Sequence, residues 1–552
     1  MSNIQVSHST STNNARSESN VVVNPLNPNQ VVGGSKKFTD PNNYQFTLIA
    51  YHSNDAGHTW AESAPLALLP GWSGISDPAL AWDDQNNCYL AALPYGPPGL
   101  TLIGIAMYKS TDGGATWGNP SLIHASGGDD KQWAIGDPNS GRVYVAWDDG
   151  VLRFARTTDH GATWKGTLAS PPPGAQLAPA SFSPEMAINS GGDLYVFWSA
   201  GNVVNFVKST NGGDSFTGTQ VAASGITLLS GALPTTDGWP HFPGGTFRVL
   251  TLVTCCVGRN DEIMVAWADA RETDGLGNHG SRIYYRRSID GGATWLGSAS
   301  GDPLLANDAS VPKTLHHFHP QIINRPNSDQ VGCTFYEFGP KPTQMLIDTM
   351  IAYSTNNGGS FGSAITVTDM PWNPAIDAPW SHGDPNVTFI GDYFGFDASN
   401  VGFYPFWTDT RTGIQEIFTD IVSPIVKIHV KEIKDIKDAI KEHKEYAFDK
   451  HYIKERVPDK VFVPEKSQVK DFKEKDKEKD IYEDLGQKIA LESVVPFERS
   501  IDEKFRALEG RIRELESHIR KGDVFINVEE HPDVAGKVVK ESNRQSRRKK
   551  SP

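Results

Sequence analysis

The first 422 residues are predicted to form an all-β repeat fold, and two observations predict it. An eight-residue turn motif recurs six times, and runs rich in β-branched and aromatic residues precede the copies. The closing aromatic residues of successive copies are 57, 47, 52, 79 and 66 residues apart. This spacing is expected when each repeat is one small multi-stranded unit with variable loops, so we predict four-stranded units.

The turn motif reads Ser/Thr-x-Asp/Asn-x-Gly-x-Thr/Ser-Trp/Phe, and its clearest copy runs from Ser288 to Trp295. Asp and Ser side chains bond nearby backbone N–H groups, and glycine supplies the positive φ of a tight reversal. The closing aromatic ring offers a large apolar surface for packing. We therefore predict a structural role for the third residue of each copy: Asp55, Asp112, Asp159, Asn211, Asp290 and Asn356.

These turns resemble the Asp-boxes, also called BNR repeats, of the sialidase-like β-propellers, over residues 15 to about 422. The resemblance implies a propeller in which each box joins the third and fourth strands of a blade, remote from the ligand face. The boxes then have no catalytic role. Because fold does not determine function, the activity has to be argued from the site.

The number of blades follows from the paired first and second β-runs of each repeat. Such pairs begin near seven positions: Glu18, Asp77, Lys131, Glu185, Phe247, His319 and Asp392. The last pair is followed by Glu416 to Thr419 and by no further turn motif, and we expect Ile4 to Ser7 to complete that blade, because a closed ring removes sheet edges. A seven-bladed β-propeller is predicted. Six blades, the number in the enzymatic sialidases, is the alternative.

Charge divides the chain near residue 422. Residues 1–422 have a net charge of −17 and residues 423–552 a net charge of +3. An acidic propeller argues against binding of nucleic acid or a membrane surface by this part of the chain. No apolar run reaches the roughly 18 residues of a membrane span, and the N-terminus lacks the pattern of a signal peptide. We expect a soluble protein, cytoplasmic by default, although relatives in the family are often exported.

The predicted domains are an N-terminal segment (1–14), the propeller (15–422), a charged linker with helical stretches (423–495), a short heptad helix (496–522) and a basic, disordered tail (523–552). The heptad helix predicts a homo-oligomer through a coiled-coil seam. An amphipathic helix docked on the propeller is the alternative. The seam residues are Ile501, Phe505, Leu508, Ile512, Leu515 and Ile519.

Candidate catalytic residues lie at the starts of the predicted first strands, which face the central opening. Paired carboxylates there have the chemistry of a glycoside hydrolase, and the candidates are Asp77, Glu185, Asp392 and Tyr393. His319 also starts a first strand and is a candidate ligand-binding residue. No regular carboxylate or Cys spacing accompanies it, so we predict no metal and no cofactor.

Two turns after second strands share the frame Trp-x-Asp-x-Arg, and they supply the other ligand-binding candidates: Asp269, Arg271, Asp409 and Arg411. The arginines offer bidentate forks to an anionic ligand, or the Asp–Arg pairs only brace their turns. Aromatic residues of the connecting loops suit stacking on sugar rings, with loop packing as the alternative: Trp239, Trp372, Trp380 and Tyr393.

If the resemblance extends to exo-sialidase activity, it implies that this chain has three converging arginines, a Tyr nucleophile with a Glu, and an Asp general acid. In the family the first arginine lies ahead of the first box in a Phe/Tyr-Arg-Ile-Pro motif. Here Arg16 stands in Ala-Arg-Ser-Glu, and the nearest similar segment, Phe247-Arg248-Val249-Leu250, lies in the fifth repeat and lacks the proline. We therefore predict a non-catalytic or divergent propeller that recognises carbohydrate or another anionic ligand. The alternatives are an exo-acting glycoside hydrolase and a protein–protein interaction scaffold.

Overall fold

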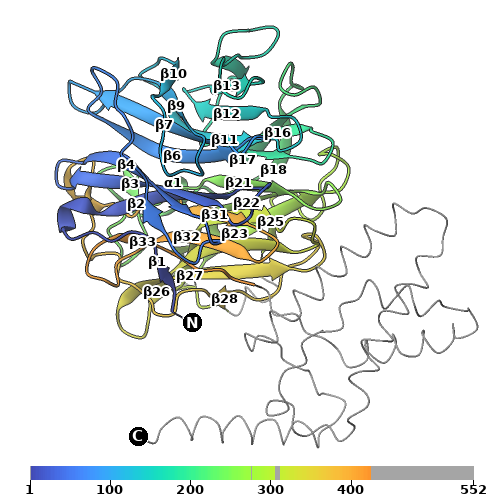
Figure 1. Ribbon diagram of the computed structural model, residues 1–552. Helices are drawn as coiled ribbons and strands as arrows, with labels where there is room; N and C mark the ends of the chain where they lie inside the picture. The colour runs from blue at the N-terminus through green and yellow to red at the C-terminus, as the bar shows by residue number, and fades with distance from the viewer. Residues whose placement is uncertain (1, 275, 305–310, 424–552) are drawn as a thin grey trace, which may run out of the picture. The chain divides into compact units, whose positions relative to one another are not determined.

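The computed structural model describes residues 2–274, 276–304 and 311–423, and these form a seven-bladed β-propeller (Figure 1). Each blade is an antiparallel meander in which the first strand is innermost. Blade 1 consists of β2 (Arg16–Val23), β3 (Val31–Asp40), β4 (Gln45–Ser53) and β5 (Ala61–Glu62). Blade 2 consists of β6 (Gly74–Trp82), β7 (Cys88–Gly96), β9 (Ile105–Ser110) and β10 (Ser121–His124), with β8 (Thr101–Leu102) beside β7. Blade 3 consists of β11 (Asp130–Gly136), β12 (Val143–Asp148), β13 (Leu152–Thr157) and β14 (Ala175–Ala178).

The next three blades follow the same order. Blade 4 consists of β15 (Glu185–Ile188), β16 (Leu194–Ala200), β17 (Val203–Ser209) and β18 (Gln220–Ser224). Blade 5 consists of β21 (Val253–Val257), β22 (Ile263–Thr273), β23 (His279–Ser288) and β24 (Asp302–Pro303). Blade 6 consists of β25 (His316–Asn324), β26 (Val331–Pro340), β27 (Met345–Ser354) and β28 (Ile365–Thr366).

The seventh blade joins the two ends of the described chain. It contains β31 (Gly395–Ala398), β32 (Phe403–Asp409) and β33 (Glu416–Thr419). Its outer strand is β1 (Ile4–Gln5), which comes from the N-terminal end of the chain. Ile4 pairs with Thr419 and Gln5 with Phe418. Figure 1 shows dark-blue β1 beside orange β32 and β33. The prediction of seven blades is confirmed, and the six-bladed alternative is wrong.

The first strands pack side by side around the ring in the order β2, β6, β11, β15, β21, β25 and β31, and β31 packs against β2 again. The core lies between adjacent blades, where the apolar faces of neighbouring sheets meet. Second strands supply its largest side chains, which are fully buried: Trp147, Trp198, Trp267 and Trp407. These strands are covered on both faces, so they consist of near-continuous apolar runs, which makes them recognisable in the sequence.

The six repeated turns have one hydrogen-bonding pattern. In the copy between β9 and β10, Ser110 Oγ accepts from Gly114 N at 2.9 Å, and Asp112 Oδ1 accepts from Thr116 N at 2.9 Å. The same bonds occur in the other copies, including the two with Asn211 and Asn356. The closing aromatic ring packs on the preceding blade, as Trp295 does on Phe206 at a centroid distance of 5.7 Å. Each turn therefore fastens one blade to the one before it.

We expect Asp112→Ala to lower the free energy of unfolding by about 1 kcal/mol, because the turn loses its side-chain acceptor for Thr116. Asp112→Asn should cost less, since Asn211 and Asn356 make the corresponding bond to backbone N–H in their own turns. Urea denaturation of the two variants measures the difference. Equal losses for Ala and Asn would contradict the role given to the side-chain oxygen.

Two long connections on the face opposite the repeated turns carry extra structure. The one before β21 contains α1 (Leu229–Ala232) and the hairpin β19 (Thr235–Thr236) with β20 (Trp239–Pro240), and the one before β31 contains the hairpin β29 (Trp380–Ser381) with β30 (Asp384–Thr388). A short 3-10 helix, η1 (Thr12–Asn14), precedes β2.

The placement of the fifth first strand near Phe247 is wrong, because β21 begins at Val253. Phe247 belongs to the connection before β21, where it forms a parallel bridge to Thr388 and is buried. Its ring packs on Phe318 and Phe338 of blade 6, so Phe247 is buried without belonging to a blade strand. The predicted linker, heptad helix and basic tail, residues 424–552, lie outside the described residues, so these domain assignments stay predictions.

Candidate functional site at the mouth of the ring

Four first strands carry the same backbone irregularity near the central opening. Glu18, Asp77, Lys131 and His319 have φ values of 48°, 54°, 51° and 48°, and the strand register shifts at each of them. A positive φ costs a side-chain-bearing residue roughly 1–3 kcal/mol, and such bulges re-aim side chains at binding sites. The bulges are the feature that sets these four residues apart from the regular strand positions around them.

Six charged side chains form a buried group that we call the central ion network. Lys131 Nζ lies 2.7 Å from Asp392 Oδ2, 3.4 Å from Asp77 Oδ2 and 3.6 Å from Glu18 Oε1. Lys36, on β3, contacts Glu18 and lies 3.4 Å from Asp77 Oδ1. The sixth member is Arg248, which reaches the network from the connection before β21.

Arg248 holds Asp392 in a bidentate grip. Its Nε and Nη2 donate to the two carboxylate oxygens at 2.9 and 2.8 Å, and its Nη1 donates to Ser381 Oγ at 3.1 Å. The guanidinium carbon lies 4.5 Å from the ring centroids of both Trp239 and Phe389. Planar stacking and a fixed fork are the geometry for which Arg is used in preference to Lys. The guanidinium is thereby committed to its own protein.

Burial and mutual attraction set the protonation of the network. Burial disfavours the Asp392 carboxylate, but Arg248 and Lys131 outweigh it and hold the pKa of Asp392 below its ordinary value. Asp77 behaves in the same way, because Lys131 and Lys36 lower its pKa. Burial and the neighbouring Asp77 instead raise the pKa of Glu18 to about 7. The network therefore holds its charges as compensated pairs.

His319 and Tyr393 lie beside this network without joining it by a hydrogen bond. His319 is 2% exposed, and neither ring nitrogen has a hydrogen-bond partner among the described residues. Burial lowers the pKa of His319 to about 3, so the ring is neutral. The ring centroid of Tyr393 lies 5.8 Å from Lys131 Nζ, and burial and the nearby carboxylates raise the pKa of its hydroxyl. A nucleophilic Tyr needs the opposite shift.

Glu185 stands in a separate group between blades 4, 5 and 6. Its Oε1 accepts from Thr254 Oγ1 at 2.8 Å and from Cys255 N at 3.0 Å, and Thr254 Oγ1 also accepts from Ile322 N. Burial raises the pKa of Glu185 to about 8. The structure thus brings Asp77, Asp392 and Tyr393 together and places Glu185 apart from them.

The Trp-x-Asp-x-Arg frames brace their own turns. Asp409 Oδ2 accepts from Trp407 Nε1 at 3.1 Å, and Asp409 Oδ1 accepts from Arg411 N at 2.8 Å. Asp269 makes the same bonds to Trp267 and Arg271, at 3.0 and 2.9 Å. Arg411 also contacts Asp369 and Asn3, so it holds the N-terminal segment against blade 7. These arginines share no partner with Arg248, and the geometry favours the bracing interpretation.

Three aromatic side chains form a stack beside Arg248 that we call the aromatic rim: Trp239, His382 and Tyr44. The Trp239 and His382 rings are 5.2 Å apart at 10°, and His382 and Tyr44 are 4.8 Å apart at 25°. His382 is exposed and Trp239 is half-buried, whereas Trp372 and Tyr393 are buried. Of the predicted stacking residues, Trp372 therefore packs against Tyr336 of blade 6, and Trp239 offers a ring at the surface. Trp380 is half-buried in β29.

Sequence reasoning missed Lys36, Arg248 and His382 as site residues. The similarity of Phe247-Arg248-Val249-Leu250 to the family's arginine motif was the one signal pointing to Arg248. Lys36 lies mid-strand, and the reach of its side chain into the ring follows only from the packing of blade 1 against its neighbours.

Two groups have the donor types of a metal site: Asp83, Asp84 and His160, and His124, Asp129 and Asp149. Their carboxylates already accept protein hydrogen bonds, from Tyr89 OH at 2.9 Å in the first group and from Trp147 Nε1 at 2.7 Å in the second. These hydrogen bonds indicate that the two groups stabilise turns and the core. The absence of a bound metal or cofactor stays a prediction.

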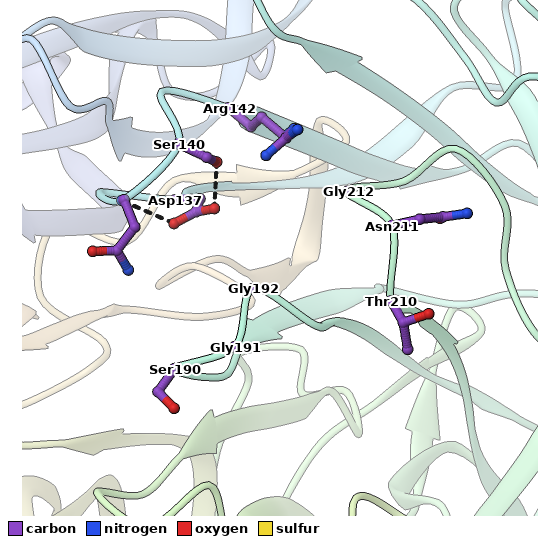
Figure 2. A pocket seen from close by; sticks show the side chains of 10 residues that line it. Asp137, Ser140, Arg142, Ser190, Gly191, Gly192, Thr210, Asn211 and Gly212 are labelled. Atoms are coloured by element: carbon purple, nitrogen blue, oxygen red, sulfur yellow. Dashed lines mark hydrogen bonds between the residues drawn. The ribbon is translucent and has the colours of Figure 1, made fainter.

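A polar cavity of about 360 Å³ lies away from the mouth, on the face of the repeated turns between blades 3 and 4 (Figure 2). It is lined by the turn after β11, the turn after β15 and the repeated turn of blade 4, including Arg142 and Gly212. His160 occupies the position equivalent to Gly212 in the turn of blade 3, and its ring bonds Asp84 of the preceding blade at 2.8 Å. At Gly212 the Arg142 side chain lies where a Cβ would be, because a Cβ there would come within 2.8 Å of Arg142 Nε.

No family model matches the chain. The xyloglucanase Xgh74A of Acetivibrio thermocellus is 29% identical over 140 residues, and a xyloglucanase of a Paenibacillus species is 30% identical over 135 residues. These segments cover 24% and 23% of this chain and only 16% and 13% of the two relatives. The match therefore concerns a small part of those enzymes.

Three solved structures are similar over more of the chain. A Dyadobacter fermentans protein of unknown function has 16% identity and a TM-score of 0.39, covering 64% of this chain and 98% of that one. The NanB sialidase of Streptococcus pneumoniae has 12% identity and a TM-score of 0.39, covering 62% and 68%. The GH93 α-L-arabinofuranosidase of Fusarium graminearum has 12% identity and a TM-score of 0.40, covering 76% and 97%. Likenesses of this size identify neither a ligand nor a reaction.

A search of the described residues for a helix with the length and apolar character of a membrane span finds none.

Proposed function

We propose that this propeller binds carbohydrate at the aromatic rim. The observation that carries the proposal is the exposed His382 ring stacked between Trp239 and Tyr44, beside a guanidinium held in place by Asp392. Sugar rings bind on flat aromatic faces, and because Trp239 and Tyr44 cover the two faces of His382, the half-buried Trp239 at the end of the stack is the ring that offers a face to a sugar. The xyloglucanases that match part of the chain act, by name, on a carbohydrate, which agrees with this class of ligand.

We further propose that the protein binds its ligand without hydrolysing it. An exo-sialidase mechanism needs several free guanidinium groups and an activated Tyr. Among the described arginines, only Arg248 forms an ion pair with a residue of the central ion network. Arg16 instead donates to Tyr51 and Glu62. The carboxylates Asp77 and Asp392 are fully committed to lysines and Arg248. These contacts therefore argue against a pair of carboxylates that acts as acid and base on a bound substrate.

The repeated turns support membership of the sialidase-like architecture. We propose that they are Asp-boxes, because each uses a Ser or Thr hydroxyl and an Asp or Asn oxygen to hold the same backbone N–H groups. They join third and fourth strands, as Asp-boxes do in the family named above. The heptad seam of residues 501–519 lies outside the described residues, and we propose that it makes the propeller multivalent.

We expect His382→Ala and Trp239→Ala each to weaken glycan binding at least tenfold while the melting temperature changes little. A glycan array followed by isothermal titration calorimetry on the best ligand measures the affinity. His58→Ala is a matched control, because His58 is an exposed histidine in the first repeated turn, on the other face. Unchanged affinity in both rim variants would contradict the proposed site. If the protein hydrolyses any glycoside of a fluorogenic panel, and substitution of Asp77 or Asp392 at the mouth abolishes that activity, the hydrolase alternative is favoured instead.

A further inference from the structure

The loops on the face opposite the repeated turns hold few basic side chains, and those in the described residues are already paired. Arg248 pairs with Asp392 at 2.8 Å and Lys341 with Asp348 at 2.7 Å. Lys313 contacts Glu272, and Arg411 contacts Asp369 and Asp409. An anionic ligand would therefore meet no unpaired cation on the described part of these loops.

Carboxylates without an ion pair lie in the three turns that carry the aromatic rim. Asp237 lies in the β19–β20 turn two residues before Trp239, and Asp384 begins β30 two residues after His382. Asp40 ends β3, in the same turn as Tyr44. The turns are fastened together, because Asn386 Nδ2 donates to Asp237 Oδ2 at 3.2 Å and Trp380 N donates to Pro41 O at 3.1 Å. The three carboxylates and the aromatic rim thus belong to one surface.

We infer that the ligand of the aromatic rim is a neutral, hydroxyl-rich saccharide and not an anionic one such as a sialoside. This inference rests on the proposed function. A carboxylate is purely a hydrogen-bond acceptor and suits sugar hydroxyl groups, which donate. The same carboxylates repel a sialic or uronic acid within the Debye length of about 8 Å at physiological salt. Arg248, which would have to attract such a group, already carries Asp392 on its Nε–Nη2 edge and bonds Ser381 and His382 through Nη1.

Affinity electrophoresis and calorimetry of the full chain, at pH 7 and physiological salt, test the inference. The probes are two neutral polymers, xyloglucan and arabinan, and two anionic ones, polysialic acid and polygalacturonate. We expect at least one neutral polymer to bind tenfold or more tightly than either anionic polymer. Tighter binding of an anionic polymer, weakened by added salt, would overturn the inference and leave the proposed function intact. Binding of none of the four, with no hit on the glycan array, would sink the proposed function itself.

Charge variants separate hydroxyl recognition from a general effect of net charge. Asp237→Asn combined with Asp384→Asn should weaken binding of the neutral polymer three- to tenfold, because an amide replaces two of the acceptors. Asp274→Asn removes the same kind of charge from the β22–β23 turn, where Asp274 bonds only its own turn, and should leave affinity unchanged. Equal effects in all of these variants, or a gain in affinity for polysialic acid with Asp274→Asn, would contradict a specific acceptor role.

Discussion

Asp392→Ala is expected to lower the free energy of unfolding by about 3–5 kcal/mol, because it leaves two buried cations without their shared counter-ion. Asp392 is fully buried and accepts from Lys131 at 2.7 Å and from Arg248 at 2.8 and 2.9 Å. Truncation of one partner of a buried pair costs far more than the pair contributes in total, since the remaining charge cannot regain water. Chemical denaturation at pH 7 measures the loss.

A double-mutant cycle with Arg248→Met distinguishes the ion pair from simple packing. If the Arg248–Asp392 ion pair causes the loss, the double variant loses clearly less stability than the sum of the two single losses. In the double variant both charges of the pair are gone, so neither remains buried without its partner. Asp392→Asn keeps the volume and one acceptor and serves when the alanine variant is too unstable to study. Additive losses in the cycle would show that the Arg248–Asp392 contact carries no coupling energy.

Glu185→Gln is expected to gain stability relative to the wild type as the pH rises from 5 to 8. The pKa of Glu185 is raised by burial from 4.5 to about 8, so the folded chain keeps a proton that the unfolded chain releases over this range. A group of this kind contributes most below its unfolded pKa, and its contribution falls as the pH rises toward the folded pKa. The variant escapes this loss, which is on the order of 4 kcal/mol between pH 5 and 8. Urea titrations at several pH values measure the difference.

Asp329→Asn is the matched control for this pH dependence. Asp329 is 54% exposed, so its substitution changes the charge of the chain without altering a buried site. Its stability relative to the wild type should stay nearly constant from pH 5 to 8. Parallel pH profiles for the wild type and Glu185→Gln would show that Glu185 is not protonated in the folded protein at neutral pH.

The architecture could be predicted because it depends on local and periodic features. A turn that needs Ser, Asp, Gly and an aromatic residue at set positions is visible in sequence, and Asp112 or Asp290 can be assigned a structural role from it alone. The closing strand followed from the lack of a fourth run after Glu416, since a ring cannot leave an edge open. Phe247 was misplaced because an apolar residue packed beneath loops looks like a strand residue in sequence.

The candidate site was predictable only in part. Asp77, Lys131, His319 and Asp392 were placed near the opening because strand starts converge there in a ring. The ion pairs among them could not be predicted, because the left-handed φ of Glu18 and Lys131 occurs in residue types that rarely adopt it and so has no signature in the sequence. The bracing role of Asp409 toward Trp407 and Arg411 was one of two interpretations, and bond geometry was needed to favour it.

By itself the sequence determined the number of repeated units, the face on which the turns lie and the way in which the two ends of the propeller meet. The first two depend on short-range hydrogen bonds and on apolar runs within single strands, and the third depends on the need of a ring to leave no sheet edge open. The tertiary structure alone decided that Lys36 and Arg248 neutralise the mouth carboxylates, and that His382 stacks between Trp239 and Tyr44. Apart from those of Lys36, these contacts join residues more than a hundred positions apart, and the energies of ion pairs and stacked rings depend on distance and burial, which only the packed blades define.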